Sequence, residues 1–262
     1  MDLGLENKTA LVFGAGGGLG GAIARALARE GCRVVAADAN PEAAKKTADD
    51  INDGKSGRAL SLEWELSQLE LIPSHIARIE RDYGRVEILV NNTGGPPPTP
   101  VAGQNPQVWE TYFRSMVLSV IAITDHVLLG MKEAGWGRII TSTSSGILTP
   151  IPNLGLSNAL RVSLAGWSKT LAGEIGSYGI TSNILVPGRI ATGRIEFLDE
   201  QKAARENRSV DEVRQESTRS IPLRRYGRPQ EYANAAVFLA SESASYITGS
   251  ILRVDGGLVP SI

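Results

Sequence analysis

The chain has 262 residues, of which 42% are hydrophobic and 21% charged, with a formal net charge of -1. This length is enough for one large hydrophobic core, and the near-neutral charge gives no electrostatic reason to expect a nucleic acid or a membrane as partner. The single cysteine cannot form an internal disulfide, and the two histidines make a metal site unexpected. No apolar run is near the ~20 residues that span a bilayer, so we expect a cytoplasmic protein with no membrane-spanning segment.

Short apolar runs alternate with helical patterns along the whole chain. We expect a first helix near residues 23–30 and strands at residues 9–13, 33–38, 59–64, 86–91, 138–143, 180–186 and 251–254, with further helical segments between them. This alternation is typical of parallel strands joined by right-handed crossover helices, and apolar strands fit a sheet covered on both faces. The sequence therefore predicts one α/β domain over residues 1–262.

A glycine cluster follows the first predicted strand and leads into the first helix. Glycine permits a tight turn there and lets the main chain approach a phosphate closely. Free N–H groups at a helix start, together with the helix dipole, favour a pyrophosphate. The strand–turn–helix context makes this cluster a predicted dinucleotide site, with coenzyme contacts at Gly14, Gly16, Gly18, Leu19 and Gly20.

Asp38 ends the second predicted strand, where a carboxylate can accept hydrogen bonds from both hydroxyls of an adenosine ribose. A 2′-phosphate would be repelled at this position, and no Lys or Arg in the glycine cluster or directly after Asp38 offsets that repulsion. The residue therefore favours NAD over NADP as the coenzyme. The alternative is that Asp38 only caps a helix that begins near Pro41.

An insertion near residues 193–226 lies between two strand-like segments, and its residues 194–219 are highly charged and helical in composition. Insertions beyond strand ends lie where ligands bind in α/β domains. We expect a mobile flap over the substrate site, and the alternative is a solvated pair of surface helices. Arg194, at the start of this segment, is expected on the surface, although it could meet an anionic substrate.

Several motifs occur in the order found in one enzyme family: residues 13–20, 91–94, 187–192, 227–229 and 254–257. Over nearly its whole length the chain resembles the short-chain dehydrogenases/reductases, in the branch that includes 3-oxoacyl-carrier-protein reductases. The resemblance implies a doubly wound Rossmann-type sheet of about seven strands in order 3-2-1-4-5-6-7. It also implies a homotetramer (or a dimer) that interconverts a small-molecule carbonyl and an alcohol with a nicotinamide coenzyme.

The resemblance also places further coenzyme contacts. Asn91 and Gly94 correspond to family positions that shape the coenzyme site and support the central sheet. The loop that follows the sixth predicted strand would meet the nicotinamide carboxamide through the main chain of Ile190 and the hydroxyl of Thr192, and we assign to the same site Pro187 and Gly188.

The family's catalytic Asn, Ser, Tyr and Lys fall here on Met116, Ser144, Ser157 and Arg161. Ser157 and Arg161 are four residues apart in one predicted amphipathic helix, so they share a face. A tyrosine has a pKa of about 10 that a nearby ammonium can lower, whereas an unassisted serine is a far weaker acid. Arg161 keeps its charge and can hold the nicotinamide ribose, but it cannot relay a proton as a lysine might.

Three interpretations remain open from the sequence. The first is an NAD(H)-dependent oxidoreductase with a rewired proton path that uses Ser144, Ser157 and Arg161. The second is a binding or regulatory protein that keeps the coenzyme and has lost the chemistry. The third is a non-redox enzyme in which Arg161 holds an anionic substrate or an oxyanion.

Overall fold

Within residues 2–54 and 57–262, the part of the chain that this computed structural model describes, seven parallel strands form one sheet. Their order, β3-β2-β1-β4-β5-β6-β7, confirms the prediction. The strands are β1 (Thr9–Phe13), β2 (Arg33–Asp38), β3 (Arg58–Glu63), β4 (Ile88–Asn92), β5 (Gly137–Ser142), β6 (Ile180–Pro187) and β7 (Ile251–Val254). All carboxyl ends therefore meet at one edge, and the order reverses between β1 and β4, where ligands bind in such sheets.

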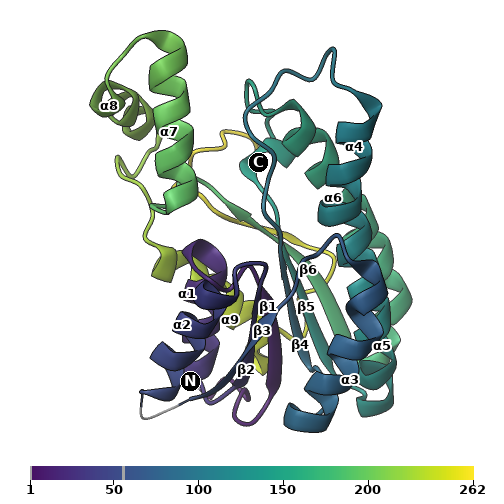
Figure 1. The fold of residues 1–262 in the computed structure, drawn as a ribbon. Helices are drawn as coiled ribbons and strands as arrows, with labels where there is room; N and C mark the ends of the chain where they lie inside the picture. Colours follow the sequence, from purple (N-terminus) through teal and green to yellow (C-terminus); the bar gives the residue numbers. More distant parts are fainter. Residues whose placement is uncertain (1, 55–56) are drawn as a thin grey trace.

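Helices cover both faces of the sheet (Figure 1). On one face lie α1 (Gly18–Arg29), α2 (Pro41–Asn52) and α9 (Pro229–Ala240), and on the other α3 (Ile72–Tyr83), α4 (Pro106–Phe113), α5 (Ser119–Ala134) and α6 (Gly155–Ile175). Side chains of β1 alternate between the two cores: Val12 packs with the α1–α9 side, and Leu11 and Phe13 pack with the α3–α5 side. This alternation follows from the two-residue period of a strand.

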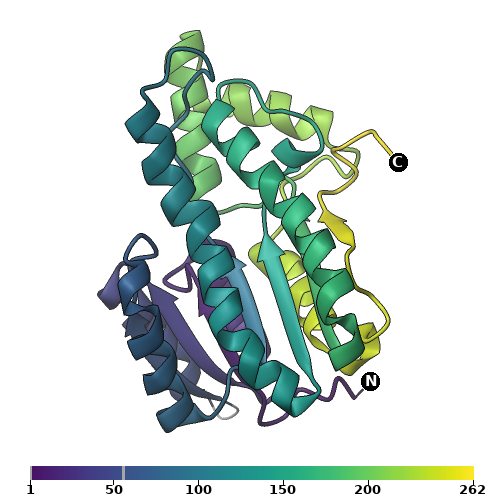
Figure 2. The ribbon, with the colours of Figure 1, turned by 90° about the vertical axis from the view of Figure 1, so that its right-hand side faces the viewer.

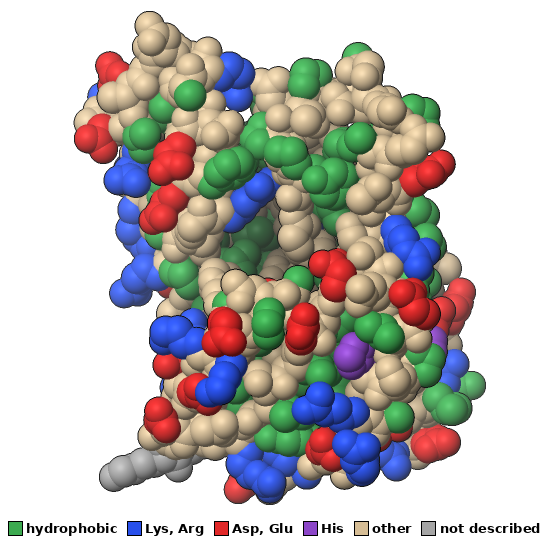
Figure 3. Space-filling model, viewed as in Figure 1, with side chains coloured by type: hydrophobic (Ala, Val, Ile, Leu, Met, Phe, Trp, Pro, Cys, Tyr) green, Lys and Arg blue, Asp and Glu red, His purple; other side chains and the backbone are tan. Residues whose placement is uncertain are grey.

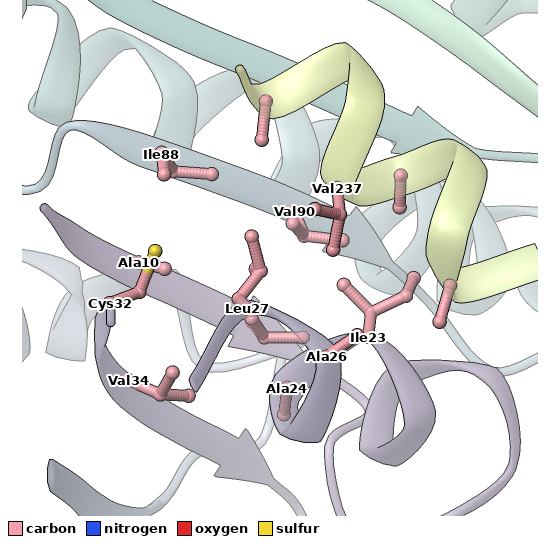
Figure 4. Packing of buried hydrophobic residues seen from close by; sticks show 14 of the residues in the cluster. Ala10, Ile23, Ala24, Ala26, Leu27, Cys32, Val34, Ile88, Val90 and Val237 are labelled. Carbon is pink, nitrogen blue, oxygen red and sulfur yellow. The ribbon is translucent and has the colours of Figure 1, made fainter. Parts of the chain in front are cut away.

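The first core is built mainly from small and branched side chains (Figure 4). Ile23 and Leu27 of α1 pack beside Val237 of α9 and over Val90 of β4. The helix α1 begins at Gly18, inside the glycine cluster, rather than near Ile23 as predicted. Its first turn is therefore rich in glycine, and it carries no side-chain cap at Gly17, which leaves main-chain N–H groups for a ligand.

A long helical run, Pro106–Ala134, joins α4 and α5 through a π-helical turn, η2 (Arg114–Leu118), and lies beside α6 (Figure 2). By length and composition alone this run could cross a membrane, although no apolar run of that length was expected from the sequence. The run is nevertheless a core element, because Ile123, Val127 and Met131 are buried against the sheet. A core helix of this kind passes the same test of length and hydropathy.

The predicted insertion forms two helices, α7 (Gly193–Glu206) and α8 (Val210–Ser220), which we call the lid. Figure 1 shows the lid beyond the carboxyl edge of the sheet, across a gap from α4 and the start of α6. Short helical turns complete the described elements: η1 (Leu69–Leu71), η3 (Ser145–Ile147), η4 (Gly176–Tyr178) and η5 (Glu242–Ala244).

Candidate active site

A cavity of about 740 Å³ opens at the carboxyl edge of the sheet, and Figure 3 shows the hollow between the two upper groups of helices. The ends of β4, β5 and β6, the start of α1, the exposed turn before α6, the lid and the chain near residues 258–260 line it. The cavity therefore lies at the switch in strand order, where the sequence places a dinucleotide.

The glycine turn has the shape that a pyrophosphate needs. Gly14 and Gly18 adopt φ values of 61° and 52°, which favour glycine, and both line the cavity with Leu19. Gly20 does not line it, because it packs under the turn: a Cβ on Gly20 would lie 2.2 Å from the carbonyl oxygen of Gly14. The uncapped N–H groups at the start of α1 face this space, so the turn fits an anionic diphosphate.

Asp38 lies directly behind the glycine turn. One carboxylate oxygen accepts a hydrogen bond from the main-chain N–H of Gly16 at 2.8 Å, and the other accepts one from that of Asn40 at 2.9 Å. The side chain of Asn40, which accepts from Ala43, is the residue that caps α2. The alternative in which Asp38 is the helix cap is therefore wrong, and its carboxylate is left beside the turn with further lone pairs available.

The motif at the end of β4 divides into a buried and a ligand-facing part. Asn91 is buried and does not line the cavity; its amide lies 3.4 Å from the hydroxyl of Thr124 and 3.5 Å from that of Thr141. Asn92 and Gly94 line the cavity instead, and Asn92 also donates to the carbonyl of Phe13 at 3.2 Å. Asn91 thus supports the sheet, and sequence reasoning missed Asn92, which is simply the next residue of the strand.

The loop after β6 closes the cavity from the other side. Pro187, Gly188, Ile190 and Thr192 all line it, as the sequence predicts. Thr192 comes close to the glycine turn, because a Cβ on Gly18 would lie 3.8 Å from its methyl group. The loop and the turn therefore face each other across one end of the cavity.

Ser144, Ser157 and Arg161 also line the cavity, so the structure brings the predicted catalytic set together. The hydroxyl of Ser144 accepts from the N–H of Gly146 at 3.1 Å and caps η3. Ser157 is 6% exposed, and its hydroxyl has no hydrogen-bond partner among the described residues. Both hydroxyls are therefore able to donate to a ligand.

Arg161 is buried and joins the ends of β4 and β5. Its guanidinium donates to the carbonyls of Thr93 at 3.0 Å, Gly94 at 2.8 Å and Ser142 at 3.4 Å. Burial, reinforced by the positive charge of Arg194, lowers the pKa of Arg161 to about 10. The side chain therefore still carries its positive charge at neutral pH.

The position of the missing catalytic amide is apolar. Met116 lies in the π-helical turn η2, is buried, and packs with Leu160 and Leu164 of α6. Turns of this kind interrupt helices at many functional sites. The π-helical turn is thus present here, but the residue at the family's catalytic asparagine position has no amide group.

No tyrosine among the described residues lines the cavity. The fully buried phenol of Tyr232, in α9, hydrogen-bonds the hydroxyl of Ser142 at 2.8 Å and donates to the carbonyl of Leu185 at 3.1 Å. Burial raises the pKa of Tyr232 above its usual value. It lies behind the cavity wall and does not replace the phenol that Ser157 lacks.

The lid lies over the cavity, and its lining residues are Arg194, Leu198, Lys202 and Glu216. This placement favours the interpretation of the insertion as a cover over the site, and not as a solvated pair of surface helices. Arg194 is exposed overall, as expected, yet its guanidinium lines the cavity and donates to the carbonyl of Pro96 at 2.7 Å. Of these lid residues, only Arg194 was singled out from the sequence, as a side chain that could meet an anionic substrate.

A buried carboxylate ties the lid to the coenzyme loop. Asp199 of α7 is fully buried; it accepts from the guanidinium of Arg189 at 2.6 Å and from the hydroxyl of Tyr226 at 2.7 Å. Arg189 belongs to the loop after β6 that faces the glycine turn. These contacts therefore join the lid to that loop.

Known proteins match this chain across nearly its whole length. The family model described as enoyl-(acyl carrier protein) reductase matches residues 14–259. The 3-oxoacyl-[acyl-carrier-protein] reductase FabG of Escherichia coli is 35% identical over 256 residues, which are 97% of this chain and 98% of that protein.

Two solved structures have the same fold. L-sorbose reductase from Gluconobacter frateurii, complexed with NADPH and L-sorbose, is 27% identical with a TM-score of 0.94, and the match covers 100% of both chains. A 7α-hydroxysteroid dehydrogenase complexed with NADH and 7-oxo glycochenodeoxycholic acid is 30% identical with a TM-score of 0.89, over 98% of this chain and 96% of the other.

Proposed function

This chain belongs to the short-chain dehydrogenase/reductase family of oxidoreductases, and we propose that it interconverts a carbonyl and an alcohol with NAD(H), as a reductase of the 3-oxoacyl type. The observation that carries the proposal is the convergence of Ser144, Ser157 and Arg161 with the loop after β6 in one cavity. Polar side chains that face a cavity without a protein partner gain hydrogen bonds when a polar ligand enters, and a carbonyl oxygen is such a ligand.

The coenzyme preference rests on Asp38. Its carboxylate is fixed by the N–H groups of Gly16 and Asn40 at the place where an adenosine ribose would lie beside the glycine turn. A carboxylate there would bind ribose hydroxyls and repel a 2′-phosphate. More of the related structures name NADPH or NADP than NADH, so only this side chain, and not the fold, supports NAD for this chain.

When bound, a reduced nicotinamide supplies a hydride to a carbonyl carbon. The protonated guanidinium of Arg161 would stabilise the negative charge that develops on the carbonyl oxygen. Ser144 and Ser157 would orient that oxygen through their hydroxyls. Because a serine hydroxyl is a much weaker acid than a phenol, we infer that the proton comes from water in the cavity, relayed across these hydroxyls.

The test begins with the purified protein titrated separately with NADH and NADPH. We expect at least tenfold tighter binding of NADH, followed by oxidation of NADH in the presence of members of a carbonyl panel. Tight NADPH binding with weak NADH binding would overturn the coenzyme assignment. Tight NADH binding with no turnover on any carbonyl would favour the alternative of a coenzyme-binding protein, and turnover without a net redox change would favour the non-redox enzyme.

A further inference from the structure

Two guanidinium groups meet at one point of the cavity wall. A Cβ on Gly95 would lie 3.4 Å from an Nη atom of Arg194 and 3.5 Å from one of Arg161. The two nitrogens are therefore at most ~7 Å apart, a distance at which two like charges near a protein surface still repel each other. Arg161 comes from α6 and Arg194 from the lid, on opposite sides of the gap that Figure 1 shows.

Neither of these charges is compensated by a carboxylate. In the described part of the chain, Arg161 and Arg194 form no ion pair and donate only to main-chain carbonyls. The cavity's other cations are paired: Arg189 contacts Asp199 at 2.6 Å, and Lys202 contacts Glu216 at 3.3 Å. The uncompensated positive charge is thus concentrated beside Gly95, one turn of α6 from Ser157.

Arg194 also has unused donors. A guanidinium carries five N–H groups, and that of Arg194 makes one hydrogen bond, to Pro96, in the described structure. Figure 3 shows positively charged side chains at the edge of the hollow. A guanidinium with free donors beside a second positive charge, in a partly desolvated cavity, matches the planar oxygen pair of a carboxylate or the oxygens of a phosphate.

We propose that the substrate carries an anionic oxygen group, a carboxylate or a phosphate, which Arg194 and Arg161 hold beside the reacting carbonyl. This inference rests on the proposed function and specifies its substrate class. The rest of the substrate is mostly apolar, because Ile151, Leu154, Leu198 and residues 258–260 make much of the remaining wall apolar, beside hydroxyl side chains such as Ser217 and Ser220. An acidic carbonyl compound with an apolar body fits both parts of the wall.

Three probes separate the possibilities: benzoylformate, its uncharged methyl ester, and phenyl phosphate. Each is titrated by calorimetry into the full-length protein, with and without saturating NAD. We expect benzoylformate or phenyl phosphate to bind at least about 30-fold more tightly than the ester, the factor that corresponds to one desolvated charge pair. The stronger of the two anions identifies the group as carboxylate or phosphate.

Variants assign the preference to the named residue. Arg194→Gln should abolish the preference for the anion, and Arg194→Lys should keep part of it. Arg205→Gln is the matched control, because Arg205 lies on the same helix, is exposed and pairs only with Glu206. Thermal melting of each variant shows whether the fold is intact, and Arg194→Lys carries the test if Arg194→Gln does not fold.

The outcomes distinguish this inference from the proposed function. The inference is overturned if neither anion binds more tightly than the ester, or if Arg194→Gln leaves the preference unchanged. If NAD fails to bind while an anion binds in an Arg194-dependent manner, the proposed function fails and the anion site stands. If NAD binds and neither anion has an advantage, only the substrate class is wrong.

Discussion

Gly20→Ala gives the sharpest test of the glycine turn, because the structure predicts the sign of its effect. Gly20 lies in the first turn of α1, where alanine has a helix propensity up to ~1 kcal/mol better than glycine. Its Cβ, however, would lie 2.2 Å from the carbonyl oxygen of Gly14, 2.6 Å from its carbonyl carbon and 2.7 Å from the carbonyl oxygen of Phe13. All three atoms belong to the main chain, so the turn itself must move.

Overpacking of this kind costs about 1–3 kcal/mol. At ~2–4 °C per kcal/mol for a chain of this size, we expect the midpoint of thermal unfolding to fall by several degrees. A shifted turn also misplaces the N–H groups that face the diphosphate, so NADH affinity should fall at least tenfold. Differential scanning fluorimetry and NADH titration measure the two effects.

Gly17→Ala is the matched control in the same turn. Its Cβ would meet no heavy atom within 4 Å, and its φ of 175° is extended backbone that alanine adopts. The loss of a glycine cap costs less than ~1 kcal/mol, so this variant should keep nearly the wild-type melting temperature. If Gly20→Ala melts at or above the wild-type temperature, the close approach of α1 to the turn is not as described, and the reasoning is refuted.

Three further predictions concern the coenzyme, the proton donor and the buried thiol. Asp38→Ser should raise the affinity for NADPH relative to NADH by at least about tenfold, and an unchanged ratio in paired titrations would contradict the role of the carboxylate. Ser157→Tyr combined with Arg161→Lys should raise NADH-dependent reduction of uncharged ketones by ~10²-fold or more and lower that of acids; a loss with both substrates would count against it. Burial of the thiol, and next the negative charge of Glu87, raise the pKa of Cys32 to about 12. As the pH rises, the folded chain therefore keeps this proton after the unfolded chain has lost it. Stability relative to Cys32→Ala should therefore fall by ~1–2 kcal/mol between about pH 8 and about pH 10.5 in urea titrations, and parallel curves would exclude the shift.

The fold could be predicted because its signals are local and repeated. Each strand is a short apolar run, and the two-residue alternation of a strand between both cores is visible in Leu11, Val12 and Phe13. The start of α1 could not be placed, because glycine has a low helix propensity and only the packing of Gly20 under Gly14 holds the first turn. The continuous helical run through Met116 could not be predicted either, because polar residues interrupt its apolar pattern.

The candidate site could be predicted where motifs mark it and not where distant segments meet. The turn at Gly14 and the acid at Asp38 are readable from a strand, a glycine cluster and a spacing. The approach of Arg194 to Arg161 is not, because it depends on how the lid folds back over the end of β4. Asn92 was missed for a smaller reason: the strand period decides which of two adjacent asparagines faces the ligand, and one residue of register reverses the answer.

The exchange of Tyr and Lys for Ser157 and Arg161 changes the site as a unit. A small hydroxyl at Ser157 leaves open the space that a phenol would fill, directly beside a guanidinium. Arg161 still anchors the ends of β4 and β5 through three carbonyls, so the coenzyme edge of the cavity keeps its support. The charge of Arg194 would be unfavourable next to Arg161 unless an anion enters between them. An anionic ligand would fill the space beside the small Ser157 side chain and would offset the charge of the two arginines. The combination therefore indicates an enzyme with a changed substrate more than one that has lost its activity.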